Sequence, residues 1–147
     1  MIVTMDTNVL VQALSNNKGA SYLILDLIYE GKINLALSLP VFYEYEDVLN
    51  RDRILKLIGL NQSEISDVLT LIFHFAEKHK IFFLFRPNLK DEKDNIFVEL
   101  AVKSNSKYLI TSNIKDFKNN ELKFPELKII TPGEFVKMWR QKNEKES

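Results

Sequence analysis

The sequence contains no cysteine, no internal repeat, no low-complexity stretch and no long run of apolar residues. The absence of cysteine excludes a disulfide framework and any zinc or iron–sulfur site with thiolate ligands. A helix that crosses a bilayer needs about 18 to 20 consecutive apolar residues, and no segment approaches that length. The sequence therefore predicts a protein with no membrane segment.

The sequence also lacks an excess of charge of either sign. Its 20 basic side chains balance 20 acidic ones, so nothing draws the whole molecule onto nucleic acid and any such contact must be local. Residues 1–6 lack the basic region and the small-residue cleavage site of a signal peptide. Together with the absence of cysteine, this predicts a cytoplasmic protein.

The chain does contain enough apolar residues for one core. It has 147 residues, of which 46% are hydrophobic, and a chain of this length buries about 68–70% of its unfolded surface on folding. We expect a single domain over residues 1–140. The charged residues 141–147 are expected to form a flexible tail.

Short apolar runs, typical of strands, alternate with longer amphipathic segments, typical of helices. The strands are expected over residues 2–5, 33–39, 81–85, 108–110 and 128–130. The helices are expected over 9–14 and 20–29, from Pro40 onward, and over 63–79, 93–103 and 132–139. Ser63 is expected to be the N-cap of the helix over 63–79. Because most strands are apolar on both faces, the pattern predicts an α/β fold, a three-layer α/β/α sandwich with a central parallel sheet.

Polar residues follow the expected strands at the places where such sheets bind ligands, beyond the carboxyl ends of the strands. Asp6 follows the first strand, and the segment from Thr111 to Asn113 follows another. The segment from Lys90 to Asp94 enters the helix that precedes that second strand. We expect these three segments to meet at one edge of the sheet.

A fourth candidate emerges from helix geometry. At about 100° per residue, Glu46 and Asp47 point away from the apolar face of the helix that starts at Pro40, whereas Glu44 lies about 40° from Val48 at the border of that face. The apolar face itself comprises Val41, Phe42, Tyr45, Val48 and Leu49. Of the three acids, Glu44 is therefore the one placed to reach a shared site.

Each acid also has a purely structural interpretation. Asp6 and Asp94 are suitable helix N-caps, and Glu44 taken alone is typical of a solvated flank. Convergence favours the other interpretation, because several carboxylates brought together repel one another unless a cation lies between them. A hard divalent cation such as Mg²⁺ or Mn²⁺ accepts oxygen ligands and activates water for phosphodiester hydrolysis.

Four segments, in order, resemble the PIN domain. They are the first strand with residues 6–9, the helix with residues 44–49, the run 91–95 before residues 99–101, and residues 108–113. More narrowly, the chain is similar to the VapC-like toxin components of bacterial and archaeal toxin–antitoxin modules. The resemblance extends from residue 2 to about residue 136.

This resemblance implies a metal-dependent ribonuclease that hydrolyses RNA with Mg²⁺ or Mn²⁺ and is paired with an antitoxin protein; a homodimer is left open. Asp6, Glu44 and Asp94 would be the catalytic, metal-binding acids, and Asn8, Asp91 and Thr111 would support the site. Where many relatives carry an aspartate, this chain has Asn113, a neutral ligand. Asp116 is then a candidate to supply the missing charge.

Basic residues near these segments are candidates for contacts with RNA phosphates. Arg51, Arg53 and Lys56 follow the Glu44 helix, and Lys90 and Lys93 flank the acids. A solvated face balanced by nearby acids is the alternative for each of them.

Three other classes of protein were weighed against this interpretation. A haloacid-dehalogenase phosphatase needs a second acid two residues after the first, and Asn8 occupies that place. A receiver domain needs an acidic pair after the first strand, and only one acid is present. The serious alternative is a PIN-like domain that binds RNA or protein with weakened or absent catalysis, because Asn113 leaves one carboxylate missing.

Overall fold

Five strands form one sheet in which all neighbouring strands are parallel. In the order β3-β2-β1-β4-β5, they are β3 (Glu77–Lys78), β2 (Asn34–Leu37), β1 (Ile2–Met5), β4 (Tyr108–Ile110) and β5 (Lys128–Ile130). The structure is a computed structural model that describes residues 1–81, 92–117 and 124–146, with side chains described except for 92–94 and 145–146.

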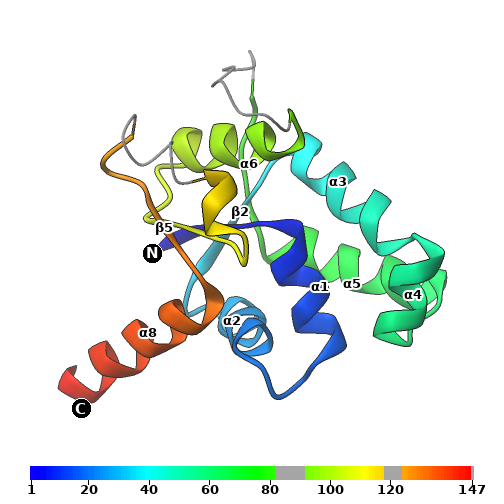
Figure 1. The fold of residues 1–147 in the computed structure, drawn as a ribbon, viewed down its shortest axis with the longest axis horizontal. Coiled ribbons are helices and arrows are strands. Elements are labelled where there is room, and N and C mark those ends of the chain that lie inside the picture. The colour runs from blue at the N-terminus through cyan, green and yellow to red at the C-terminus, as the bar shows by residue number, and fades with distance from the viewer. Residues whose placement is uncertain (82–91, 118–123, 147) are drawn as a thin grey trace.

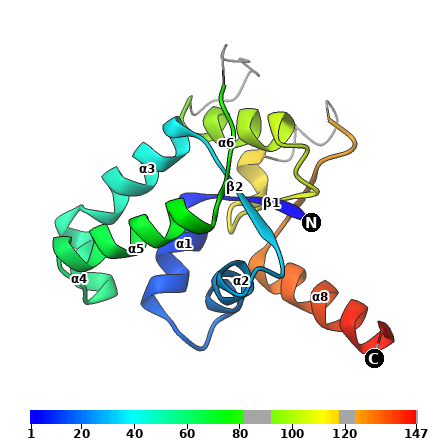
Figure 2. The same cartoon turned by 180° about the vertical axis from the view of Figure 1, so that it is seen from behind.

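Helices cover both faces of this sheet. They are α1 (Thr7–Ser15), α2 (Ala20–Tyr29), α3 (Leu39–Leu49), α4 (Asp52–Ile58), α5 (Gln62–Phe75), α6 (Glu92–Lys103) and α8 (Pro132–Glu146). Helix α6 packs on β1, β2 and β4, and α2 packs between α1 and α8. Helix α6 lies on one side of the strands, and α2 and α8 lie on the other (Figures 1 and 2). The predicted three-layer α/β/α sandwich is confirmed.

The central strands are buried on both faces, as their sequences predict. Val3, Thr4 and Met5 of β1 are all fully buried, although their side chains alternate between the two faces. The hydroxyl of Thr4 is satisfied by a hydrogen bond of 2.9 Å with that of Ser106. A sheet sandwiched between helices requires this pattern, because neither face is exposed to water.

Several element boundaries differ from those that the sequence pattern predicts, and α5 and the strand after it differ most in position. Helix α5 begins one residue before Ser63, and Asn61 caps it in a reciprocal capping box with Glu64. The helix ends at Phe75, and the next strand is the short β3 at Glu77–Lys78. The strand expected over 81–85 is therefore wrong at Ile81, and residues 82–85 lie outside the described residues.

Helix α8 is longer than the pattern predicts. It continues past Trp139 to Glu146 and so includes most of the segment that was expected to be a tail. Residues 140–146 lack an apolar face but consist largely of Arg, Gln, Lys and Glu, which favour the helix. No helix in the described part of the chain is both long and apolar enough to cross a membrane.

The order of the strands defines where a ligand site belongs. From β1 the chain adds β2 and β3 on one side, and it then crosses to place β4 on the other side of β1. In open parallel sheets this reversal leaves a crevice beyond the carboxyl ends of the two strands that flank it. Those ends are followed by Asp6 and Thr111.

Candidate active site

Asp6 and Thr111 lie next to each other because their strands are paired in register. Met5 of β1 pairs with Ile110 of β4, and the N–H of Asp6 continues the ladder by donating to the carbonyl of Ile110 at 2.9 Å. The hydroxyl of Thr111 then donates to Oδ2 of Asp6 at 2.8 Å. Thr111 thus contacts Asp6 directly, and its role in supporting a site stays a prediction.

The capping interpretation of Asp6 does not account for its side chain. Asp6 occupies the N-cap position of α1, but its carboxylate does not make the usual capping hydrogen bond to the second or third residue of that helix, and it interacts instead with the backbone of Thr7, the first residue. The side chain is instead 94% buried, since only 6% of it is exposed, and it is held by Thr111. A buried carboxylate without a capping role needs another explanation.

The electrostatic environment of Asp6 disfavours its charged form. Burial is the largest effect and raises the pKa of Asp6, and the negative charges of Asp116 and Glu44 raise it further. The hydrogen bonds from Thr111 and from the backbone of Thr7 oppose this shift without cancelling it. Glu44 on α3 and Asp116 in the segment after β4 therefore each lie close enough to Asp6, at the end of β1, for their charges to act on it.

Glu44 lies on α3 as the helix geometry predicts. Val41, Tyr45 and Leu49 are buried, Glu46 and Asp47 are exposed, and Glu44 is half-buried between them. Helix α3 starts directly after β2, with Ser38 as its N-cap and Pro40 in its first turn. Helix α3 thus begins at the carboxyl end of β2, and Glu44 lies close enough to Asp6 for its charge to raise the pKa of Asp6.

Tyr45, beside Glu44, was not predicted as part of the site. Its hydroxyl donates to the carbonyl of Met5 at 2.6 Å, and its ring lies 6.3 Å from that of Phe97 on α6. Burial and then the negative charge of Asp6 raise the pKa of the Tyr45 phenol. The sequence signal was a tyrosine on an apolar helix face, because a buried hydroxyl requires a partner.

The segment after β4 is tied down at two points. The N–H of Asn113 donates to Oγ1 of Thr111 at 3.0 Å, and the hydroxyl of Ser112 donates to Oε1 of Gln12 at 3.0 Å. The same oxygen of Gln12 accepts from Ser21 of α2 at 3.1 Å. Gln12 is a second residue that sequence reasoning missed, and it joins α1, α2 and this segment.

Asn113 and Asp116 are both exposed, and the N–H of Asp116 donates to the carbonyl of Asn113 at 3.1 Å. A helical stretch over residues 114–117 begins between them. Of the two, Asp116 is the one whose charge reaches Asp6. Asn8, in the first turn of α1, is exposed.

The remaining acids and their basic neighbours lie at the edge of the described structure. Asp94 is in the first turn of α6, which packs against α3 (Figure 1). The side chains of Asp94 and Lys93 lie outside the described set, as do Lys90 and Asp91 entirely. Their predicted roles stay predictions.

The second group of basic residues lies on and before α4. Arg53 and Lys56 are exposed, and Arg51 is paired with Asp47 of α3 through an exposed ion pair of 2.9 Å. Their contacts with RNA also stay predictions.

The donors around Asp6 fit a hard divalent cation in chemical type. Asp6, Glu44 and Asp116 offer carboxylate oxygens, and among the described side chains no lysine or arginine is paired with any of them. The hydroxyl of Thr7 beside Asp6 is buried without a hydrogen-bond partner in the same part of the structure. The described residues alone contain no group of three His, Asp or Glu placed to hold a metal ion, and the side chain of Asp94, a third predicted ligand, lies outside them.

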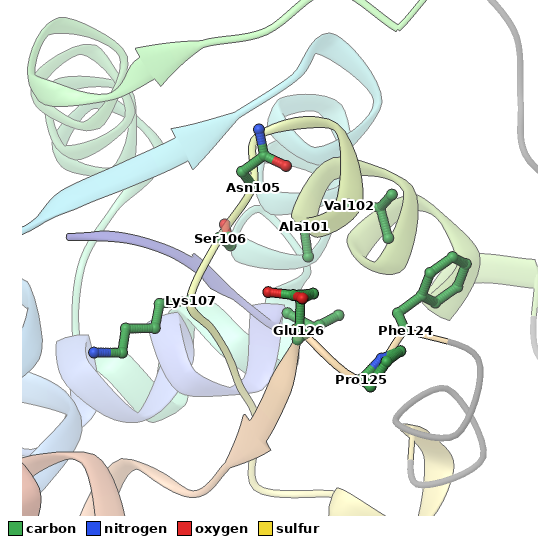
Figure 3. Close-up of a pocket in the computed structure, with 9 residues that line it drawn as sticks. Ala101, Val102, Asn105, Ser106, Lys107, Phe124, Pro125 and Glu126 are labelled. Carbon is green, nitrogen blue, oxygen red and sulfur yellow. The ribbon is translucent and has the colours of Figure 1, made fainter.

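A cavity of about 540 Å³ lies elsewhere in the molecule. It is lined by the end of α6, the turn before β4 and the segment before β5 (Figure 3). Lys107 and Leu127 immediately precede β4 and β5, so the cavity is at the amino ends of these strands, opposite Asp6. None of the predicted site residues lines it.

The fold and site together define a class: a parallel α/β/α domain with converging acids at the switch point of its sheet. The comparison with known families agrees, because residues 3–115 match the PIN domain family. The chain belongs to the PIN domain family.

The chain is also similar to individual proteins. It is 32% identical over 146 residues to the uncharacterized protein MJ1680 of Methanocaldococcus jannaschii, covering 91% of this chain and 88% of that protein. Its fold is similar to that in the crystal structure of VapBC2 from Rickettsia felis bound to a DNA fragment from their promoter, with a TM-score of 0.58, 20% identity and coverage of 89% of this chain and 98% of that one. A structure of VapBC-1 from nontypeable Haemophilus influenzae gives a TM-score of 0.55 at 16% identity, covering 90% and 99%.

Proposed function

We propose that this protein is a divalent-metal-dependent endoribonuclease and the toxin of a type II toxin–antitoxin module. The observation that carries the proposal is the buried carboxylate of Asp6, whose pKa is raised by burial and by the charges of Asp116 and Glu44. Mutual repulsion among carboxylates costs stability unless a cation is bound. Membership in the PIN domain family supports hydrolysis of phosphodiesters.

The residues that would hold Mg²⁺ or Mn²⁺ are Asp6, Glu44 and Asp94, with Asn113 or Asp116 completing the set. The cation, when bound, lowers the pKa of a water molecule and neutralises charge that develops on the phosphate.

The chain's own residues orient this site. Thr111 fixes the carboxylate of Asp6 by donating to Oδ2. The backbone N–H of Asn113 holds Thr111 in turn. Preorganised ligands of this kind cost no rearrangement when the substrate binds.

The partners follow from the same similarity. The two VapBC structures support a cognate antitoxin protein as the binding partner of this chain. RNA is the proposed substrate, with Arg51, Arg53, Lys56, Lys90 and Lys93 as candidates for phosphate contacts.

The test is RNA cleavage by the purified protein with and without Mg²⁺ or Mn²⁺. Asp6→Asn, Glu44→Gln and Asp94→Asn should each abolish cleavage without unfolding the protein. Glu46→Gln is the matched control, because Glu46 is on the same helix as Glu44 but is exposed. If the wild-type protein neither binds metal nor cleaves RNA, the domain is a non-catalytic binding protein and the proposal is wrong.

A further inference from the structure

Tyr45 contacts the three elements that carry the proposed acids. It is fully buried and belongs to α3, next to Glu44. Its hydroxyl bonds to the carbonyl of Met5, the residue before Asp6. Its ring packs against Phe97 of α6, three residues after Asp94. Tyr45 therefore joins α3 to β1 and to α6.

We propose that Tyr45 is a positioning residue that sets the separation of Glu44 and Asp6 and seats α6 beside them. The proposal rests on the proposed function and adds a residue to its machinery. Tyr45 touches neither metal nor RNA in this account and acts through the backbone of Asp6.

The mechanism of this positioning lies in one peptide plane. The carbonyl of Met5 and the N–H of Asp6 belong to the same rigid, planar peptide group. Tyr45 holds the carbonyl at 2.6 Å, and the carbonyl of Ile110 accepts from the N–H at 2.9 Å. With both ends of this plane bonded, the backbone that carries the Asp6 carboxylate has one orientation.

Pairing with β2 does not restrain the peptide group between Met5 and Asp6. The residues of β1 that pair with β2 are Ile2 and Val3, so Met5 lies beyond this pairing. The opposite side of Met5 still pairs with Ile110 of β4. Tyr45 therefore takes the place of a strand partner and joins α3 to β1 by a side chain.

Tyr45→Phe tests the proposal because it removes the hydroxyl and keeps the ring. Tyr108→Phe is the matched control: Tyr108 is also buried, packs its ring against Phe135 at 5.8 Å and lies at the amino end of β4, away from Asp6. Both variants are examined by thermal melting, Mn²⁺ titration and steady-state RNA cleavage. Hydrogen exchange of the segment over residues 2–8 reports on the Asp6 backbone without requiring activity.

Tyr45→Phe should remain folded, exchange faster over residues 2–8 and bind Mn²⁺ about five- to tenfold more weakly, the equivalent of one lost buried hydrogen bond. Its kcat should fall about 10- to 100-fold while KM for RNA changes less than about twofold, as expected of a misplaced group. Phe97→Leu, which loses the ring contact, should weaken Mn²⁺ binding in the same direction. Tyr108→Phe should match the wild type in exchange, metal affinity and turnover.

Wild-type metal affinity and kcat in Tyr45→Phe, in a protein whose wild type binds metal and cleaves RNA, would overturn the positioning role alone. Equal losses in Tyr45→Phe and Tyr108→Phe would do the same, because they would reflect general stability. A wild-type protein that neither binds Mn²⁺ nor cleaves RNA would instead overturn the proposed function.

Discussion

Replacing Thr111 by valine tests the hydrogen bond that holds Asp6. Valine has nearly the shape of threonine, so the fully buried site keeps its packing and loses the hydroxyl, which donates to Oδ2 of Asp6 at 2.8 Å and accepts from the N–H of Asn113 at 3.0 Å. The bond from Asn113 does not depend on the charge of Asp6, so the pH dependence distinguishes the two. A hydrogen bond to a charged group contributes about 1.5–3 kcal/mol. We therefore expect Thr111→Val to destabilise the metal-free protein at neutral pH by about 2 kcal/mol, which is roughly 4–8 °C in Tm for a domain near this length.

The control is Thr111→Ser, which keeps the hydroxyl and loses a methyl group worth about 0.8 kcal/mol. The difference between the two variants should depend on pH. The bond from Thr111 lowers the pKa of Asp6, so its contribution is full while Asp6 is ionised and shrinks as the pH falls through the pKa of Asp6 in the folded state.

Urea unfolding of both variants at neutral and acidic pH gives the free energies directly. Equal stabilities of Thr111→Val and Thr111→Ser at neutral pH would refute the reasoning. So would a difference that stays constant into acid.

Three further predictions concern the same site. Asn113→Asp should tighten Mg²⁺ binding and raise the rate of RNA cleavage, because a charged oxygen adds attraction that an amide lacks; equal affinities in a Mg²⁺ titration would place residue 113 outside the metal's ligands. Arg51→Ala should raise KM for RNA severalfold and change the free energy of unfolding by no more than about 1 kcal/mol. Lys32→Ala, which breaks the similarly exposed pair with Glu30, should leave KM unchanged, and a KM shift of the same size in both variants would assign the effect to net charge. Asp6→Asn should be more stable than wild type in metal-free buffer at neutral pH, because a carboxyl group whose pKa is raised on folding destabilises the folded protein as the pH rises. This gain should vanish in acid, where Asp6 is protonated in both the folded and the unfolded state, and a gain that persists in acid would show that ionisation is not its cause.

The sequence was sufficient to predict those positions of the site that follow from the order of strands and helices and from the helical period. The alternation of strands and helices placed Asp6 and Thr111 at neighbouring strand ends, and the period of 3.6 residues separated Glu44 from the exposed Glu46 and Asp47. Both inferences need only local regularity. They are accordingly confirmed as positions, while the predicted chemistry of these residues awaits experiment.

What could not be predicted depends on long-range partners. The apolar face of α3 indicates that Tyr45 is buried, but nothing local specifies that its hydroxyl bonds to Met5, 40 residues away in the chain. Likewise, Ser63 and Asn61 are both suitable N-caps, and Asn61 is the one that has Glu64 three residues later to complete the capping box. Helix α8 extends beyond its apolar pattern because propensity alone continues it.

The central claim is that the buried carboxylate of Asp6 binds a divalent cation. The most direct test is the melting temperature of wild type and Asp6→Asn at neutral pH, without metal and across a Mn²⁺ titration. Binding to the folded state alone stabilises it by about 2.7 kcal/mol at a hundredfold excess over Kd. We expect the order to reverse: Asp6→Asn melts higher without metal, and wild type melts higher at saturating Mn²⁺. If Mn²⁺ shifts both proteins equally or shifts neither, Asp6 is not a metal ligand.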